Sequence, residues 1–160
     1  MGSRTKITAN NNWAYVAGFF DGDGSLMVQF KNRRESVSGF RPMITICFYQ
    51  DKRHSNPLKW FRKLFGIGYL SERNDGMTEL RINGYDSCEK ILKNMKPFIK
   101  FKKKQVELAL KIISKLKKVF NITPKVILEI AKISDKISQE NYSSKTRKYS
   151  YEYFEKLFKK

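Results

Sequence analysis

The sequence predicts an α+β fold in which a helix and two strands are repeated once and followed by further helices. Segments with apolar residues at helical spacing alternate with pairs of segments in which apolar and polar residues alternate. This order suits a four-stranded antiparallel sheet covered by helices on one face. No linker-like or low-complexity stretch interrupts the chain, so we expect a single domain over residues 1–160. Its core lies at about residues 10–120, with C-terminal helices and a basic loop at 121–160.

The first half of this core is a helix followed by two strands. A helix is expected over residues 12–24, where bulky apolar side chains recur at helical spacing (Tyr15, Val16, Phe19 and Phe20). Residues 24–31 and 42–49 alternate between apolar and polar side chains, as half-buried strands do. The polar residues 32–39 form the turn between them. The side chains expected to point inward are Leu26, Val28, Phe30, Ile44, Ile46 and Phe48.

The second half repeats this order. A helix is expected over residues 54–65 and ends at Gly66, because glycine accommodates the left-handed conformation that closes many helices. Residues 67–73 and 77–83 are expected to pair as a hairpin across the turn sequence Asn74-Asp75-Gly76. Further helices are expected over residues 86–95, 102–120 and 124–139, and a polar tract at 140–150 precedes a short terminal helix.

The charge of the chain restricts its partners. Lysine and arginine total 33 against 15 acidic residues, which gives a net charge of +18. Such an excess favours a polyanion, so nucleic acid is the first candidate. An anionic membrane surface is the weakest candidate, because the basic residues are spread over strands and loops. Without a long apolar run or a signal-peptide segment, the protein is expected to be soluble and not secreted, with no membrane partner.

The two cysteines and single histidine support neither a disulfide framework nor a structural zinc site.

The first helix carries a sharper pattern. Ala14, Gly18 and Gly22 fall four residues apart, on a stripe flanked by Ala17 and Asp21. Small residues let two helices approach closely. No second such stripe exists in the sequence, so we expect the partner to be a second copy of the chain in a two-fold dimer.

Two carboxylates, Asp21 and Asp23, follow at the C-terminal end of the first helix. The helix macrodipole disfavours negative charge there, and a two-fold dimer axis would bring two such ends together. A divalent cation reverses that cost, and carboxylate and carbonyl oxygens suit Mg²⁺. The alternative is that Asp-Gly-Asp-Gly serves only as the turn from helix to strand.

The residues 16–25, Val-Ala-Gly-Phe-Phe-Asp-Gly-Asp-Gly-Ser, resemble the LAGLIDADG motif of homing endonucleases. The helix–strand–strand repeat matches the core unit of that family. Residues 97–105 and 144–148 resemble segments of its small, single-motif, homodimeric members encoded by group I introns of algal organelles. The resemblance covers nearly the whole chain.

The resemblance implies a site-specific homing endonuclease. A homodimer of this kind makes a metal-dependent double-strand break, by phosphodiester hydrolysis, in a long near-palindromic site of double-stranded DNA. Mg²⁺ is the expected cofactor, Mn²⁺ is expected to substitute, and Ca²⁺ is expected to support binding without cleavage. An organelle, chloroplast or mitochondrion, is the expected location, in keeping with the abundance of residues that AT-rich genomes encode.

The resemblance also assigns catalytic roles. Asp23 matches the acidic residue that binds the metals, with help from the carbonyl of Gly22, whereas Asp21 matches a structural position. Gln50 matches a polar residue that positions water. Lys102 matches a lysine thought to stabilise developing charge near the scissile phosphate. Either His54 or Arg53 takes the basic position after Gln50.

The outward side chains of the four strands are the candidate contacts to bases, because polar and charged ends suit the major groove. A solvated sheet face is the alternative for about half of them. The polar loop before the last helix is the candidate contact to backbone phosphates. The residues on the strands, called the reading residues below, are Ser25, Met27, Gln29, Lys31, Arg33, Met43, Thr45, Cys47, Tyr49, Ser71, Arg73, Glu79 and Arg81, and those in the loop are Ser144, Lys145, Thr146, Arg147 and Lys148.

Two other functions stay open. Some members of the family are maturases, which bind intron RNA, and the loss of Asp23 would leave such a function intact. A non-catalytic, sequence-specific DNA-binding protein is the other possibility. The acidic residue at the end of the motif argues against it, because a pure DNA binder has no need of a carboxylate in an anionic interface.

Overall fold

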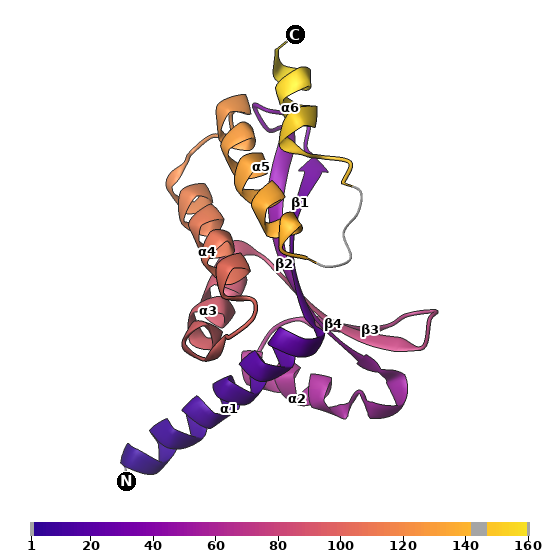
Figure 1. Ribbon diagram of the computed structural model, residues 1–160, viewed down its shortest axis with the longest axis vertical. Coiled ribbons are helices and arrows are strands. Elements are labelled where there is room, and N and C mark those ends of the chain that lie inside the picture. Colours follow the sequence, from indigo (N-terminus) through magenta and orange to yellow (C-terminus); the bar gives the residue numbers. More distant parts are fainter. Residues whose placement is uncertain (1, 142–146, 160) are drawn as a thin grey trace. The chain divides into compact units, whose positions relative to one another are not determined.

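The computed structural model describes residues 2–141 and 147–159, and the side chains within that range from residue 9 onward. Its elements follow the predicted order (Figure 1). They are α1 (Gly2–Asp23), β1 (Gly24–Asn32), β2 (Phe40–Asp51), η1 (Lys52–His54), α2 (Asn56–Phe65), β3 (Tyr69–Glu72), β4 (Met77–Asn83), α3 (Tyr85–Met95), η2 (Lys96–Phe98), α4 (Lys103–Lys118), α5 (Pro124–Gln139) and α6 (Tyr151–Phe158).

The four strands form one sheet in the order β1-β2-β4-β3. β4 pairs antiparallel with β2, where Cys47 lies opposite Arg81, and with β3, where Ser71 lies opposite Glu79. The chain divides into two compact units, and β1 and β2 each contribute to both. The prediction of a single domain therefore stays a prediction.

Unit 1 contains residues 1–26 and 45–103. Its core is a cluster of aromatic rings in which Phe48 of β2 meets Phe20 of α1 at 5.7 Å and Phe61 of α2 at 5.1 Å between ring centroids. These three side chains are fully buried. Gly66 ends α2 in the left-handed conformation, with φ of 68°, as the sequence predicted. The cluster fixes α1, and with it the carboxylates at its end, against the strands of this unit.

Unit 2 contains residues 27–44 and 104–160. Phe154 of α6 is fully buried and contacts Phe30 of β1 at 4.8 Å and Phe40 of β2 at 5.0 Å between ring centroids. Ion pairs Lys115–Glu129 and Lys104–Glu140 join α4 to α5 and to the residue that follows α5. The outer part of the β1–β2 hairpin is therefore held by the C-terminal helices (Figure 1).

The structure corrects some predicted boundaries and the expected exposure of two side chains. The predicted helix at 54–65 is split, because Asp51 caps the short helix η1 and α2 begins only at Asn56. α1 begins well before residue 12, and β2 begins at Phe40 rather than at residue 42. Thr45 and Cys47, expected to point outward, are fully buried. Among the described residues, no helix has the length and apolarity needed to cross a membrane.

Candidate active site

Asp21, near the C-terminal end of α1, holds the loop that precedes α4. Its Oδ2 accepts hydrogen bonds from the backbone N–H groups of Lys100, at 2.7 Å, and Phe101, at 3.2 Å. Its Oδ1 accepts a third from the N–H of Lys102, at 3.0 Å. The Asp21 carboxylate therefore organises the backbone of this loop, and its structural role at the site stays a prediction.

The same loop brings the Lys102 side chain to the end of α1. Lys102 Nζ donates to the backbone carbonyl of Asp21 at 2.7 Å and lies 5.7 Å from the centroid of the Phe20 ring. Burial lowers the pKa of Lys102, and the negative charges of Asp21 and Asp23 oppose that shift. The structure therefore places the predicted lysine in the electrostatic field of the predicted metal ligand.

Asp23 and Gly22 are exposed at the last turn of α1. A methyl group built on Gly22 would meet no atom within 4 Å, so the backbone here is open on one side. Within the described part of the chain, no group of three or more His, Cys, Asp or Glu side chains could hold a metal ion. One copy of the chain therefore offers oxygen donors suited to Mg²⁺ but only part of a ligand set.

The predicted residues after β2 take distinct positions. Gln50 Oε1 accepts from the backbone N–H of Asp51 at 2.8 Å. The guanidinium of Arg53 grips Asp51 through two bonds of 2.9 Å, which with the Arg53 backbone N–H lowers the pKa of the Asp51 carboxyl. His54 is exposed at the end of η1. Arg53 is thus engaged by its neighbour, and the choice between Arg53 and His54 stays a prediction.

The reading residues of unit 1 form side-chain contacts with one another. Ser25 Oγ and Tyr49 Oη lie 3.1 Å apart, and burial raises the pKa of Tyr49 to about 12. Burial also raises the pKa of the Cys47 thiol, which is fully enclosed. These side chains form a partly buried polar layer on the strands rather than a solvated face.

Ion pairs continue this layer. Arg81 Nε donates to Glu79 Oε1 at 2.6 Å, and Glu79 is only 5% exposed. Thr45 Oγ1 donates to Asn83 Oδ1 at 2.7 Å. The Arg73 guanidinium lies 5.8 Å from the Tyr49 ring centroid and pairs with Asp75. Ser71 stands opposite Glu79 in the strand register. Arg81 and Arg73 therefore have fixed orientations, whereas Thr45, Cys47 and Glu79 are covered by neighbours.

In unit 2, a pocket of about 330 Å³ lies between β1 and the segment before α6. Its lining includes Gln29, Lys31, Arg147 and Lys148. Gln29 Oε1 is buried without a hydrogen-bond partner among the described residues. Lys31 and Lys148 are exposed, whereas Met27 and Met43 are half-buried. This pocket combines donors and cations, as an anion site requires.

Arg147, a predicted phosphate contact, is hydrogen-bonded within its own unit. Its guanidinium donates to Asp135 Oδ1 at 2.7 Å and to Ser134 Oγ, and its side chain is 20% exposed. The other oxygen of Asp135 accepts the backbone N–H of Tyr151, the first residue of α6. Arg147 therefore ties this segment to α5. The predicted phosphate contacts Ser144, Lys145 and Thr146 lie outside the described residues.

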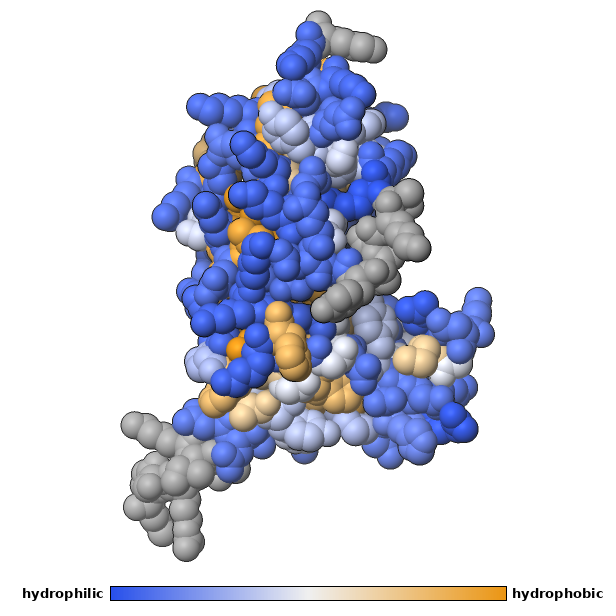
Figure 2. Space-filling model, in the orientation of Figure 1, coloured by the Kyte–Doolittle hydropathy of each residue, from blue (hydrophilic) through white to orange (hydrophobic). Residues whose placement is uncertain are grey.

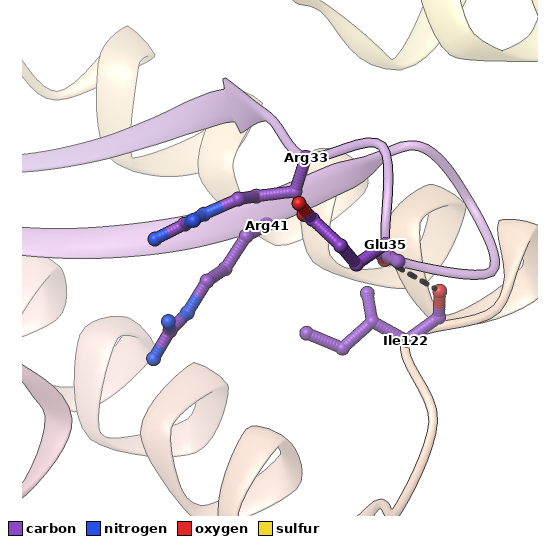
Figure 3. Close-up of a pocket in the computed structure, with 5 residues that line it drawn as sticks. Arg33, Glu35, Arg41 and Ile122 are labelled. Carbon is purple, nitrogen blue, oxygen red and sulfur yellow. Dashed lines mark hydrogen bonds between the residues drawn. The ribbon is translucent and has the colours of Figure 1, made fainter.

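Arg41 is a cation that the sequence analysis missed. It precedes Met43 by two residues, on the row of reading residues of β2, and lines a pocket of about 390 Å³ with Arg33, Glu35, Ser36 and Ile122. In Figure 3 the side chains of Arg33, which follows β1, and of Arg41, on β2, point the same way, away from Ile122. The alternation of β2 extended to Phe40 would have included Arg41.

One face of α1 is open. Tyr15 is 55% exposed, Gly18 and Gly22 are exposed, and a methyl group on Gly18 would meet nothing within 4 Å. Ala14 and Asp21 are half-buried. Ala17 is a correction, because it is fully buried in the core of its own chain and is unavailable to a partner. Figure 2 shows apolar residues gathered on this unit around α1, within a surface that is otherwise largely hydrophilic.

Known proteins resemble this chain in sequence and structure. The model of the LAGLIDADG endonuclease family matches residues 16–109. The DNA endonuclease I-CvuI of Chlorella vulgaris is 30% identical over 125 residues, which cover 78% of this chain and 76% of the relative. The DNA endonuclease I-CreI of Chlamydomonas reinhardtii is 33% identical over 138 residues, 84% of this chain and 80% of the relative.

Solved structures of homing endonucleases are also similar to the structure of this chain. Crystal structures of I-CvuI with DNA, one in the presence of Mg and one of Ca, superpose with a TM-score of 0.86 at 27% identity and cover 96% of both chains. An archaeal intron-encoded homing endonuclease, I-Vdi141I, solved with DNA, superposes with a TM-score of 0.80 at 18% identity and covers 94% of this chain and 96% of its own. This last match supports the fold alone.

Proposed function

The chain belongs to the LAGLIDADG endonuclease family, and we propose on that basis that it is a homodimeric, site-specific homing endonuclease. Two copies meet through the open face of α1, around Gly18 and Gly22, and together make a double-strand break in a long, near-palindromic site of double-stranded DNA. The observation that carries the proposal is the junction of Asp21, Asp23 and Lys102 at the end of α1. A cation held at the end of α1, in the electrostatic field of two carboxylates and beside an open helix face, serves phosphodiester hydrolysis better than it serves binding alone.

The donors at the end of α1 fit a divalent metal. The Asp23 carboxylate and the Gly22 carbonyl are hard oxygen ligands, and a two-fold dimer supplies both of them twice. Mg²⁺ bound there would polarise the phosphate and activate water. We expect Mn²⁺ to substitute for Mg²⁺ and Ca²⁺ to support binding without cleavage.

The residues of the chain have separate tasks around that chemistry. Lys102 Nζ has three donors, of which one is used by the Asp21 carbonyl, so the others are available to a phosphate oxygen. Its positive charge opposes the charge that develops on the phosphate. Gln50 orients water, and His54 or Arg53 supplies a further cation. Asp21 positions the loop that carries Lys102.

DNA recognition is divided among the reading residues. Arg81 and Arg73 are held by Glu79 and Asp75, which leaves guanidinium N–H groups directed at bases. Gln29, Lys31, Arg33 and Lys148 are proposed to make polar contacts to DNA, and we add Arg41 to this set. Thr45, Cys47 and Glu79 act through the neighbours that cover them. Lys145 remains a proposed phosphate contact.

The organisms of the two relatives, Chlorella and Chlamydomonas, are green algae and suit the proposed origin in an organelle intron. The proposed location is a chloroplast or mitochondrion. No observation favours the maturase or the silent DNA-binding protein over the endonuclease.

The test is a selection with a randomised duplex library. The protein is incubated with the library in Mg²⁺ and in Ca²⁺, alongside Asp23→Asn, and both the cleaved ends and the bound pool are sequenced. Glu152→Gln, which removes an exposed carboxylate of α6, is the matched control. We expect breaks within a near-palindrome only in Mg²⁺, with the parent and the control, and selective binding by all three proteins in Ca²⁺. Selective binding without breaks under any metal would make the DNA-binding protein the better assignment.

A further inference from the structure

The turn between β1 and β2 comprises residues 33–39. It is longer than common hairpin loops, which have about two to five residues. Loops of this length are usually mobile. This one has its own backbone bonds, since Arg33 N donates to Gly39 O at 2.8 Å and Gly39 N donates to Ser36 O at 2.9 Å. Gly39 takes a φ of 76°, which side chains rarely adopt. The turn therefore has a defined shape.

A second segment of unit 2 fixes that shape in place. The carbonyl of Ile122, in the connection between α4 and α5, accepts the backbone N–H of Ser38 at 3.0 Å and lies 3.4 Å from Ser36 Oγ. Ser36 Oγ donates also to Phe40 O at 2.8 Å, and Ser38 is 8% exposed. The hairpin turn is thus bonded to a segment more than 80 residues later in the chain.

The position of the Ile122 carbonyl is fixed by the start of α5. The next residue, Thr123, is the N-cap of α5, and its Oγ1 accepts the backbone N–H of Val126 at 3.3 Å. The Ile127 N–H bonds to the Thr123 carbonyl at 3.0 Å. The start of a regular helix therefore sets the position of the acceptor that holds the hairpin.

One arginine begins this turn and another follows it on β2. Arg33 opens it and Arg41 follows it, and both line the pocket that Ile122 closes on one side (Figure 3). Their guanidinium groups point together away from Ile122 (Figure 3). The hydrogen bonds of Ser36 and Ser38 to the Ile122 carbonyl are called the tie below. A guanidinium distinguishes bases only when its donors are held in register with the acceptors of one base pair.

From these contacts we infer that Ser36, Ser38 and Ile122 are positioning residues for sequence discrimination, acting through Arg33 and Arg41. The inference rests on the proposed function. β1 leads from the end of α1 to this turn, so nine residues of extended chain, at about 3.3 Å each, lie between Asp23 and Arg33. The arginines therefore read the outer base pairs of each half-site. The tie orders the turn before DNA arrives, so binding does not have to supply that ordering.

Two variants loosen the tie without touching Arg33 or Arg41. Ser36→Ala combined with Ser38→Ala removes the hydroxyl groups, and Ile122→Gly frees the connection that carries the acceptor. Phe120→Ala is the matched control, because this side chain lies in the same connection and is 100% exposed. Amide hydrogen exchange on the free proteins measures the tie directly, and thermal denaturation checks that each variant folds.

The specificity measurement uses the parent's selected site with every single-base replacement, in Ca²⁺ for binding and in Mg²⁺ for cleavage. We expect both loosened variants to exchange residues 33–39 faster and to lose about threefold to tenfold of their discrimination at the outer positions. Discrimination at inner positions and the cleavage rate on the parent site stay unchanged, and Phe120→Ala matches the parent throughout.

Each other outcome has a distinct meaning. Faster exchange with outer discrimination intact overturns the inference, and so does an equal loss at every position, which indicates general destabilisation. Unchanged exchange in both loosened variants overturns it too, because the turn is then held by other contacts. A parent that binds DNA selectively but never cleaves contradicts the proposed function, while the Ca²⁺ arm still tests the inference.

Discussion

Asp21 and Lys102 are joined by two hydrogen bonds, and Lys102 is the donor in both. The Asp21 carboxylate accepts the Lys102 backbone N–H at 3.0 Å, and the Asp21 backbone carbonyl accepts the Lys102 ammonium at 2.7 Å. The residue that ends the helix with a carboxylate thus also sets the place of the lysine. Because Asp21 accepts both bonds, we expect this position to affect activity although it has no predicted catalytic role.

Asp21→Asn should therefore impair two properties at once. An amide presents only one acceptor oxygen, so at least one of the backbone N–H groups of Lys100, Phe101 and Lys102 loses its partner. We expect a loss of about 1–3 kcal/mol in the free energy of unfolding, measured by urea denaturation. Single-turnover cleavage should also slow. The control Asp75→Asn, in the β3–β4 turn, should lose less than half as much stability, and equal losses would contradict the argument.

Lys102→Met should lower the single-turnover cleavage rate by about a hundredfold or more in saturating Mg²⁺, because it removes the charge that faces the developing negative charge. Binding in Ca²⁺ should weaken by far less. Lys103→Met, the exposed neighbour in the first turn of α4, is the control. Equal effects of the two substitutions on cleavage would reduce Lys102 to one more phosphate contact.

The pH dependence of cleavage gives a separate test of Lys102. Burial lowers the pKa of this lysine, so its positive charge is lost at a lower pH than that of an exposed lysine. Cleavage should then decline with rising pH earlier than ordinary lysine titration allows. Lys102→Arg should move that alkaline decline to higher pH, since arginine keeps its charge. The folded state disfavours the proton here, so this group adds to stability as pH rises.

Gly18→Leu should convert the dimer to a monomer without unfolding the chain. A Cβ at this position meets nothing within 4 Å in its own protomer, and a leucine side chain there would hold two α1 helices apart. Sedimentation equilibrium should give the monomer mass, while circular dichroism keeps its helical signal. Lys111→Leu on the exposed face of α4 should leave the dimer intact. A dimer that persists in Gly18→Leu would locate the interface elsewhere.

Arg147→Ala should lower the stability of the fold, whereas Lys148→Ala should weaken DNA binding. Arg147 is engaged by Asp135 and Ser134, so its loss should lower the free energy of unfolding by about 1–3 kcal/mol. Lys148 is exposed, so Lys148→Ala should keep stability but reduce the slope of log affinity against log salt by about one. A sequence-selective loss of binding in Lys148→Ala would contradict its assignment to phosphates.

Local patterns predicted most of the fold. The prediction of a helix at 124–139 matches α5 because Thr123 and Pro124 form a strong start, and the end of α2 follows from Gly66. The start of α1 was missed because residues 2–11 have no apolar period. The predicted strand begins at residue 42, two residues after the start of β2, and so it does not include Arg41. The first error occurs where apolar spacing is absent, whereas the alternation of β2 does continue back to Phe40.

The candidate site was predictable in its motif but not in its contacts. Asp23, Gly22 and Lys102 follow from the family resemblance. Cys47 and Glu79 are buried on strands whose partners place Arg81 opposite Cys47 and Tyr49 opposite Glu79, and alternation along one strand does not report these neighbours. Ala17 was misplaced for a related reason, since a spacing of small residues does not show which side of a helix its own chain covers.

The chain moves between its two units at residues 26, 44 and 103. Residues 27–44 leave the ribosome well before the segment 104–160, which completes their unit. During synthesis, Phe30 and Phe40 must therefore wait for Phe154, near the C-terminus, before their rings are buried. A nascent or prematurely terminated chain exposes an unpacked apolar hairpin, which makes such chains candidates for capture by chaperones and for degradation.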